Sequence, residues 1–211
     1  MKKIKILLAD DHFIVLEGLK RIIEECEDME VIATALDGRD AVRLAIEKRP
    51  HVAVVDISMP IYDGLEVIAL LQQHLPSMPI LILTMHEEEQ YIFRAIEAGA
   101  MGYITKKAVA DQLVTAIRRV YQGKRYLPED VAEIIALKIA RGRGNSPLDL
   151  LSTRELQVLK RIAQGQTNRE IARDYNLSVK TIDTYRQRIL RKLNLRNNAD
   201  ISRFAITHKL I

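Results

Sequence analysis

Five short apolar runs rich in Val, Ile and Leu recur along the first half of the chain, and stretches with helical spacing separate them. Runs of this length predict buried strands of a parallel sheet. The predicted strands lie near 4–9, 31–35, 52–56, 80–84 and 101–105. The predicted helices lie near 12–25, 38–48, 64–74, 87–98 and 108–121. The alternation predicts an α/β domain with a doubly wound, five-stranded parallel sheet.

The pattern changes after about residue 121. The segment Tyr126-Leu127-Pro128-Glu129-Asp130 predicts a helix near 128–140, because Pro is favoured at the first helical position. Residues 141–147, RGRGNSP, hold two Gly and one Pro and predict a flexible linker. We therefore expect one domain over 1–121, a linker over 122–149 and a second domain over 150–211.

The rest of the chain shows only helical patterns. Two capping boxes, each a Ser or Thr followed three residues later by Glu, predict helix starts at Ser152 and Thr167. Ser178 predicts the start of a longer helix that ends near Leu193, and a last helix is expected over 198–207. A short helix, a brief turn and a longer basic helix are the plan of a helix-turn-helix domain.

Charge is divided unevenly between the two parts. Residues 1–147 hold 19 Lys and Arg against 22 Asp and Glu, a net charge of −3, whereas residues 148–211 hold 13 against 6, a net charge of +7. This asymmetry favours a polyanion such as DNA as the partner of the second part. The single cysteine, Cys26, excludes an internal disulfide and favours a cytoplasmic location. No apolar run approaches the roughly 20 residues of a membrane helix, so no membrane association is expected.

Four of the predicted strands end in polar residues. Asp10 and Asp11 follow the first strand, Asp56 ends the third, Thr84 the fourth, and Lys106 follows the fifth. The carboxyl ends of parallel strands meet at one edge of a sheet, so we expect these side chains to lie close together. Three carboxylates favour a hard cation such as Mg²⁺. With an ammonium and a hydroxyl beside them, the set suits transfer of a phosphoryl group to a carboxylate.

Several longer motifs carry a resemblance to a known family. LLADDH, VVDISMPIYDG and LTMHEEEQYIFRAIEAGAMGYITK resemble a response-regulator receiver domain, which is flavodoxin-like. LSTRELQVLKRIAQGQTNREIARDYNLSVKTIDTYRQRILRKL resembles a LuxR/FixJ-type DNA-binding domain. Over nearly its whole length the chain therefore resembles the NarL/FixJ subfamily of two-component response regulators. The resemblance implies a DNA-binding transcriptional regulator that is controlled by phosphorylation, not an enzyme with turnover.

The same resemblance implies roles for the strand-end residues. Asp56 would accept a phosphoryl group from a sensor histidine kinase. Mg²⁺ would be bound by Asp11, Asp56 and the backbone carbonyl of Ser58, while Asp10 would act largely through water. Lys106 would pair with the acceptor and its phosphoryl oxygens.

Two further residues would respond to phosphorylation. Thr84 would hydrogen-bond the phosphoryl group, and Tyr103 would be an aromatic switch that moves inward with it. The expected consequence is release of the DNA-binding domain, formation of a homodimer, or both. Lys107 departs from the family pattern, because receivers commonly have Pro after the lysine.

The predicted recognition helix has a core side and an outward side. Ile182, Ile189 and Leu193 fall at helical spacing and should face the core, and Val179 should pack at the helix start. The outward side should read base edges through Asp183, Thr184 and Gln187 and contact phosphates through Lys180, Arg188 and Arg191. The full set expected at the DNA is Lys180, Thr181, Asp183, Thr184, Arg186, Gln187, Arg188 and Arg191.

Two other readings stay open from the sequence. A phosphatase or phosphotransferase would also use Asp56 as a nucleophile, but Ser58 stands where such an enzyme needs a second carboxylate. An atypical regulator would bind DNA without phosphorylation, against which the intact acidic set argues. His12 and His86 flank the site with no zinc-binding spacing and are expected to be rim residues.

Overall fold

The structure is a computed structural model that describes residues 3–86, 88–141, 147–175, 177–208 and 210–211. The chain divides into two compact units, residues 1–142 and 143–211, which are described separately. Most of the linker expected over 141–147 lies outside the described residues. No helix of the described residues is long and apolar enough to cross a membrane.

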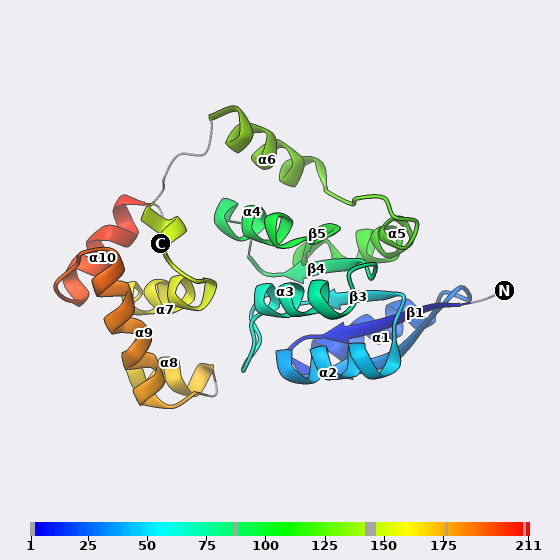
Figure 1. Ribbon diagram of the computed structural model, residues 1–211, viewed down its shortest axis with the longest axis horizontal. Helices are drawn as coiled ribbons and strands as arrows, with labels where there is room; N and C mark the ends of the chain where they lie inside the picture. Colours follow the sequence, from blue (N-terminus) through cyan, green and yellow to red (C-terminus); the bar gives the residue numbers. More distant parts are fainter. Residues whose placement is uncertain (1–2, 87, 142–146, 176, 209) are drawn as a thin grey trace. The chain divides into compact units, whose positions relative to one another are not determined.

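The first unit is built on a five-stranded parallel sheet with the order β2-β1-β3-β4-β5 (Figure 1). The strands are β1 (Ile4–Ala9), β2 (Met29–Ala35), β3 (Val52–Val55), β4 (Ile80–Thr84) and β5 (Gly102–Thr105). The predicted sheet is confirmed, although β2 begins two residues before the expected position. The order reverses between β1 and β3, which opens a crevice at their carboxyl ends.

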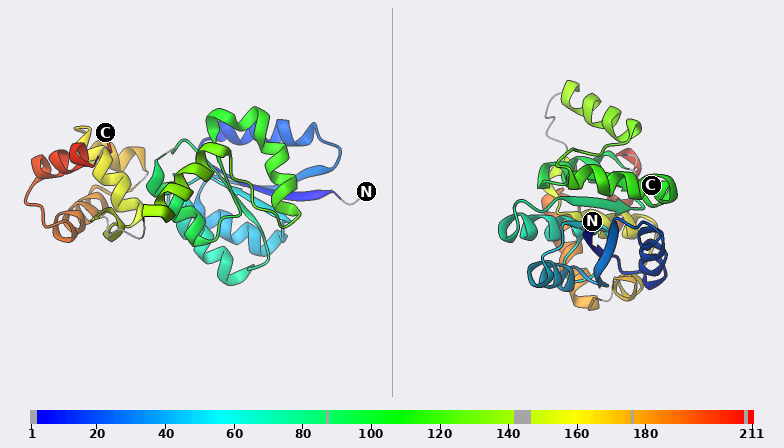
Figure 2. Two further views of the ribbon diagram at one scale, coloured as in Figure 1. Left: turned by 90° about the horizontal axis from the view of Figure 1, so that it is seen from above. Right: turned by 90° about the vertical axis from the view of Figure 1, so that its right-hand side faces the viewer.

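Helices cover both faces of this sheet (Figure 2). One layer contains α1 (Phe13–Glu24) and α5 (Val109–Tyr121), and the other contains α2 (Gly38–Lys48), α3 (Gly64–His74) and α4 (Glu89–Ala98). Because both faces are covered, the strands carry nearly unbroken apolar sequences, and every residue of β3 is buried. This rigid sheet fixes the positions of the polar residues at its carboxyl edge.

A connector follows α5 and remains part of the first unit. Tyr126 forms a parallel bridge with Gly102 of β5. Helix α6 (Glu129–Arg141) then packs against α4. The helix expected near 128–140 is therefore present one residue later, and it belongs to the compact first unit.

The second unit is entirely helical. Its elements are the 3-10 turn η2 (Pro147–Leu150) and the helices α7 (Thr153–Ala163), α8 (Asn168–Asp174), α9 (Val179–Lys192) and α10 (Asn198–Thr207). Both predicted capping boxes are confirmed, at Ser152 and Thr167, and the Ser178 side chain caps α9. Helix α9 packs against α7 and α8, as the helix-turn-helix plan predicts.

The core side of α9 differs in part from the expectation. Ile182 and Ile189 are fully buried, and Leu193 is half-buried. The prediction that Val179 packs at the helix start is wrong, because Val179 is 45% exposed. Leu190 is buried, since a core-facing stripe on a helix is wider than a single row of positions.

Candidate functional site

The acidic site lies at the carboxyl edge of the sheet, where the strand order reverses. Asp10 directly follows β1, and Asp56 directly follows β3, the neighbouring strand. Both residues are almost fully buried, at 1% and 3% exposure. Two carboxylates buried this deeply require compensation by a cation or by hydrogen bonds.

Lys106 supplies that compensation from the end of β5. Its Nζ lies 2.7 Å from Oδ2 of Asp56 and 2.5 Å from Oδ2 of Asp10. Burial acts to lower the pKa of the Lys106 ammonium, but the two carboxylates outweigh it and hold that pKa above its usual value. The lysine therefore stays protonated and fixes a positive charge beside Asp56. Asp10, expected to act largely through water, contacts Lys106 directly.

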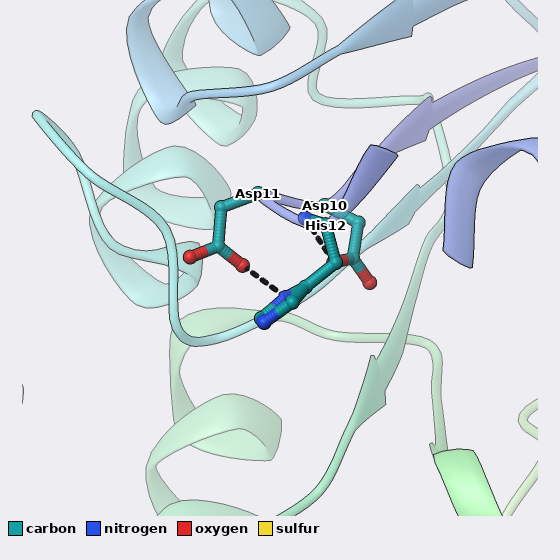
Figure 3. A group of neighbouring side chains, drawn as sticks. All are labelled: Asp10, Asp11 and His12. Atoms are coloured by element: carbon teal, nitrogen blue, oxygen red, sulfur yellow. Dashed lines mark hydrogen bonds and ion pairs between the residues drawn. The ribbon is translucent and has the colours of Figure 1, made fainter. Parts of the chain in front are cut away.

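Asp11 and His12 complete the acidic corner (Figure 3). Nδ1 of His12 lies 2.8 Å from Asp11 and 3.3 Å from Asp10, and the backbone N–H of His12 donates to Asp10 Oδ1 at 2.9 Å. Burial raises the pKa of the Asp11 carboxyl; His12 opposes this rise, and the carboxylates of Asp56 and Asp10 add to it. The sequence placed His12 on the rim without a role, and its contact with both acids was not foreseen.

The donor set fits a divalent cation. Among the described residues, Oδ1 of Asp56 is buried without a hydrogen-bond partner, whereas Oδ2 of Asp10 contacts Lys106 and Oδ1 of Asp11 contacts His12. Side-chain ligand atoms of Asp10, Asp11 and His12 lie within 4.8 Å of one another. A hard cation relieves the mutual repulsion of such oxygen donors, so the acidic cluster around Asp10 and Asp11 could bind a metal ion.

The loop after Asp56 is held tightly by two glycines. Gly64 packs so closely on the backbone of Asp56 and Ile57 that a Cβ at this position would clash. Gly38 approaches Tyr62 just as closely, and its N–H donates to the Pro60 carbonyl at 3.2 Å. The loop that carries Ser58 is therefore positioned by backbone contacts.

Ser58 and His86 connect two loops of the rim. Oγ of Ser58 lies 2.8 Å from Nε2 of His86, and Nδ1 of His86 lies 3.4 Å from Glu88 Oε2. The His86 ring also stacks on Tyr91, with ring centroids 4.1 Å apart. His86 therefore joins the loop after β3 to the loop after β4. The sequence placed it on the rim, and no spacing rule revealed this partner.

Thr84 and Tyr103 also converge on His86. Thr84 is fully buried, and its Oγ1 accepts from the His86 N–H at 3.4 Å. Tyr103 is fully buried as well, and its hydroxyl donates to the His86 carbonyl at 2.7 Å. The backbone of His86 thus links the strand-end hydroxyl to the aromatic residue of the neighbouring strand.

Lys107 does not alter the backbone by a cis bond. No cis peptide bond occurs among the described residues, and Lys106–Ala108 form a 3-10 turn before α5. The Lys106 side chain still reaches Asp56 at 2.7 Å. The presence of Lys107 in place of the usual proline is therefore compatible with the contact between Lys106 and Asp56.

Helix α9 presents a polar, basic surface in the second unit. Most of the residues expected at DNA are exposed, namely Lys180, Asp183, Thr184, Gln187, Arg188 and Arg191. Thr181 and Arg186 are half-buried. Nε of Arg186 donates to Asn198 Oδ1 at 2.6 Å, so this arginine ties α9 to α10. Lys192 pairs with Glu155 of α7 at 2.6 Å and likewise holds the helix in place.

Comparison with known proteins accounts for both units. Residues 6–118 match the response regulator receiver domain family, and residues 149–205 match the bacterial regulatory proteins of the luxR family. The chain belongs to the two-component response regulators.

Relatives and solved structures agree with this family. This response regulator is 37% identical to the oxygen regulatory protein NreC of Staphylococcus epidermidis, over 98% of this chain and 99% of that protein. It is 38% identical to the response regulator UvrY of Escherichia coli K12, over 98% and 95%. A solved structure of the RcsB response regulator in complex with DNA matches with a TM-score of 0.61 and 27% identity, over 96% of this chain and 98% of that one.

The family also defines the class of protein. This response regulator is a transcription regulator with a receiver domain and a LuxR-type DNA-binding domain, not a classical enzyme. In its receiver, the structure brings Asp10, Asp56 and Lys106 into direct contact. The residues that sequence reasoning left without partners, His12 and His86, lie at the same rim.

Proposed function

We propose that this protein is a phosphorylation-controlled switch that binds promoter DNA. A sensor histidine kinase transfers one phosphoryl group to Asp56 in the cytoplasm. The modified receiver then favours a homodimer whose two α9 helices bind two half-sites, about one helical turn of DNA apart. The observation that carries this proposal is the buried Asp56 carboxylate. One of its oxygens lies 2.7 Å from Lys106, and the other has no hydrogen-bond partner within the described part of the chain.

The chemistry follows from these two oxygens. No described residue hydrogen-bonds Oδ1 of Asp56, which suits this oxygen to attack phosphorus. The bond from phosphorus to the donor's histidine nitrogen breaks as the new bond forms. Lys106 is placed to neutralise charge on the transferred oxygens. Thr84 lies at the end of the adjacent strand as a hydrogen-bond donor.

Mg²⁺ is the cation that we propose for the acidic corner. When bound, it neutralises charge on the phosphoryl oxygens. Asp11, Asp56 and the Ser58 carbonyl would hold it, with Asp10 as their neighbour. Burial is the main cause of the raised pKa of Asp11, and the carboxylates of Asp56 and Asp10 add to it; this crowding of like charges, which a cation would relieve, supports the assignment.

Helix α9 supports the proposed binding to DNA. Its exposed surface carries Lys180, Arg188 and Arg191 around Thr184 and Gln187. A helix of this kind enters the major groove, where cations contact phosphates and short polar side chains reach base edges. Arg186 is the weakest member of the set, because Asn198 already accepts its hydrogen bond.

Labelling with a small phosphodonor tests the phosphorylation step. In the presence of Mg²⁺ we expect one phosphate per chain, none in Asp56→Asn, and a labelled site that mass spectrometry locates at Asp56. Undiminished labelling of Asp56→Asn would exclude the proposed acceptor. Continuous release of many phosphates per chain would instead support the phosphatase reading.

Binding to DNA is tested with the same preparations. We expect the phosphorylated protein to bind selected promoter fragments more tightly than the unphosphorylated protein, with an affinity that falls as salt rises. Equal affinity before and after labelling would support the atypical regulator that needs no phosphorylation. Sedimentation of both forms measures whether labelling favours the dimer.

A further inference from the structure

His12 occupies a position that helix capping does not explain. It is the N-cap of α1, where Ser, Thr, Asp and Asn are favoured because their side chains accept a hydrogen bond from a helix N–H. The His12 side chain forms no such cap. Its backbone anchors the helix start, since its carbonyl accepts from the N–H groups of Val15 and Leu16. The imidazole ring therefore serves a purpose other than capping.

The imidazole ring is turned toward the two carboxylates that follow β1 (Figure 3). Its Nδ1 lies 2.8 Å from Oδ1 of Asp11 and 3.3 Å from Oδ1 of Asp10. Two ligands at right angles on an octahedral ion, each about 2.1 Å from the metal, lie about 3.0 Å apart. Both distances from Nδ1 are therefore close to the spacing of neighbouring ligands on a single ion.

A third carboxylate shows independently that a cation fits here. Asp56 is 3% exposed, and its Oδ1 has no hydrogen-bond partner among the described residues. Asp56 lies near Asp11, because its charge adds to the rise in the pKa of Asp11 that burial mainly causes. A buried carboxylate oxygen without a donor is costly unless a cation or a hydrogen bond compensates it. The contacts of His12 do not provide that compensation.

The corner has a buried side and a solvent side. The Asp10 side chain is 2% exposed and contacts Lys106, whereas the His12 side chain is 66% exposed. A metal ion held by these side chains would therefore keep positions open toward water, as catalytic metal sites do. Such an ion can exchange with solvent without any opening of the sheet.

The donor atoms of the corner are of two chemical kinds. Carboxylate oxygens suit Mg²⁺ and the divalent transition-metal ions alike, whereas an imidazole nitrogen suits ions such as Co²⁺, Ni²⁺ and Zn²⁺. His86, also at the rim, is engaged elsewhere, with Nε2 at Ser58 and Nδ1 near Glu88. His12 is therefore the rim histidine whose nitrogen faces the acidic pair.

We propose that His12 is a nitrogen ligand of the acidic corner, through which the receiver binds a divalent transition-metal ion of the Co²⁺, Ni²⁺ or Zn²⁺ kind more tightly than Mg²⁺. Mg²⁺ uses the oxygen donors alone. His12 thereby determines which cation the receiver selects. This inference rests on the proposed function, because it starts from the cation site of that proposal.

Magnetic resonance with Co²⁺ reads the nitrogen ligand directly. Co²⁺ is paramagnetic and strongly shifts the proton resonances of an imidazole ring that it binds. We expect such shifted resonances in the wild-type protein and none from this ring in His12→Phe. The matched control is His74→Phe, at an exposed position near the end of α3, which should give the wild-type spectrum. A wild-type protein that binds Co²⁺ at the corner without shifted imidazole resonances would overturn the proposal.

Affinities for Co²⁺ and Mg²⁺ separate a ligand from a simple counter-charge. Affinity for most sites rises along the transition series, so the effect of His12 on the ratio of the two affinities is the decisive quantity. His12→Phe should weaken Co²⁺ binding by at least about tenfold and change Mg²⁺ binding much less. His12→Lys keeps a positive charge, but its ammonium has no lone pair, so it should weaken Co²⁺ binding to the same extent.

A role of His12 as a counter-charge alone predicts a different pattern. His12→Lys would then match the wild type, and His12→Phe would bind both ions more tightly; either result would overturn the proposal. Asp11→Asn should weaken the binding of both ions. Undiminished binding of both ions by Asp11→Asn would contradict the cation site of the proposed function together with this inference. An unchanged ratio in His12→Phe, with both ions weakened by Asp11→Asn, would contradict this inference alone.

Discussion

Nζ of Lys106 lies 2.7 Å from Oδ2 of Asp56, at the end of a side chain that is 11% exposed. The same ammonium also contacts Asp10, while Asp11 lies 2.8 Å from Nδ1 of His12. One fixed positive charge thus serves two buried carboxylates. Because the carboxylates outnumber the ammonium, single substitutions at this site should change the stability of the receiver and its response to added cations.

Removal of the ammonium should destabilise the metal-free receiver. Lys106→Met leaves Asp10 and Asp56 buried without their cation, so we expect the free energy of unfolding to fall by about 3 kcal/mol. Added Mg²⁺ should restore part of the loss, because it replaces the missing charge. Urea unfolding with and without Mg²⁺ measures both effects. Lys124→Met, at an exposed position away from the acidic site, is the matched control and should change little.

The effect of substituting Asp11 on the stability of the protein should change sign when Mg²⁺ is added. Burial, opposed by His12 and reinforced by Asp56 and Asp10, raises the pKa of Asp11 in the folded protein above the usual value of 3.8. The charged carboxylate therefore costs no stability below pH 3.8; the cost grows as the pH rises above that value and is complete above the folded pKa. At neutral pH, metal-free Asp11→Asn should be more stable than the wild type, and with Mg²⁺ it should be less stable.

Thermal unfolding at both conditions checks this reversal. Asp28→Asn is the control. Asp28 forms an ion pair with Arg118 at a distance of 2.8 Å, and this pair lies away from the rim. The hydrogen bonds from Arg118 hold the pKa of Asp28 below its usual value, so loss of its charge should slightly destabilise the protein. That small effect should not depend on Mg²⁺. An identical response of both variants to the cation would argue against a site at Asp11.

The sequence predicted the parts of this molecule that depend on periodicity. Buried strands such as β3 are unbroken apolar runs, and parallel strands place their carboxyl ends together, so Asp10, Asp56 and Lys106 were expected to meet. Capping boxes are local patterns, and Ser152 and Thr167 begin their helices as predicted.

Contacts between distant segments were not predictable in this way. The pair Ser58 and His86 spans 28 positions, and no periodic pattern relates the two residues. Gly102 was simply part of a strand, and the need for a glycine is explained only by the carbonyl of Tyr126 beside it. Val179 was misplaced because a first helical turn often projects beyond the core. Long-range packing decides each of these cases.

The contact between Ser58 and His86 should affect the lifetime of the phosphorylated form. The His86 ring joins the loop after β3 to the loop after β4, so loss of this contact should open the rim to water. The side-chain amide of a glutamine at position 86 is long enough to reach Ser58, as Nε2 of His86 does. The shorter asparagine side chain is not. We expect His86→Asn to lose its phosphoryl group several-fold faster than the wild type, and His86→Gln to lose it at nearly the wild-type rate.

Decay of the labelled protein after removal of the phosphodonor gives these rates. Ser58→Ala should resemble His86→Asn, and the double variant should be no faster than either, because one contact is lost in all three. Additive rates would show that the two side chains act independently. The initial rate of labelling serves as a check that the acceptor itself is intact.

The exposed face of α9 should separate affinity from specificity. Lys180→Ala removes a proposed phosphate contact, so binding should weaken on all DNA sequences and the slope of log affinity against log salt should become shallower by about 1. Gln187→Ala removes a proposed base contact and should reduce discrimination between sites, by about 1–3 kcal/mol at one base pair, with the salt slope unchanged. Binding titrations over a salt series distinguish the two. A change in slope for Gln187→Ala would reassign it to the phosphates.

The DNA-binding unit should lose stability in acid through Glu155. Burial raises the pKa of Glu155, but its bonds with Lys192 and Ser152 outweigh this and hold the pKa below the usual 4.5. A lowered folded pKa means that the stabilisation is complete above 4.5 and is lost as pH falls through the folded value. Glu155→Gln should therefore lower the free energy of unfolding by about 1 kcal/mol at neutral pH, and this difference should shrink in acid.

Urea unfolding followed by circular dichroism measures this difference. Glu170→Gln is the control, because Glu170 forms the same capping box with Thr167 but no ion pair with a lysine among the described residues. A difference between Glu155→Gln and the wild type that stayed constant down to pH values well below 4.5 would contradict the ionic contribution of Glu155.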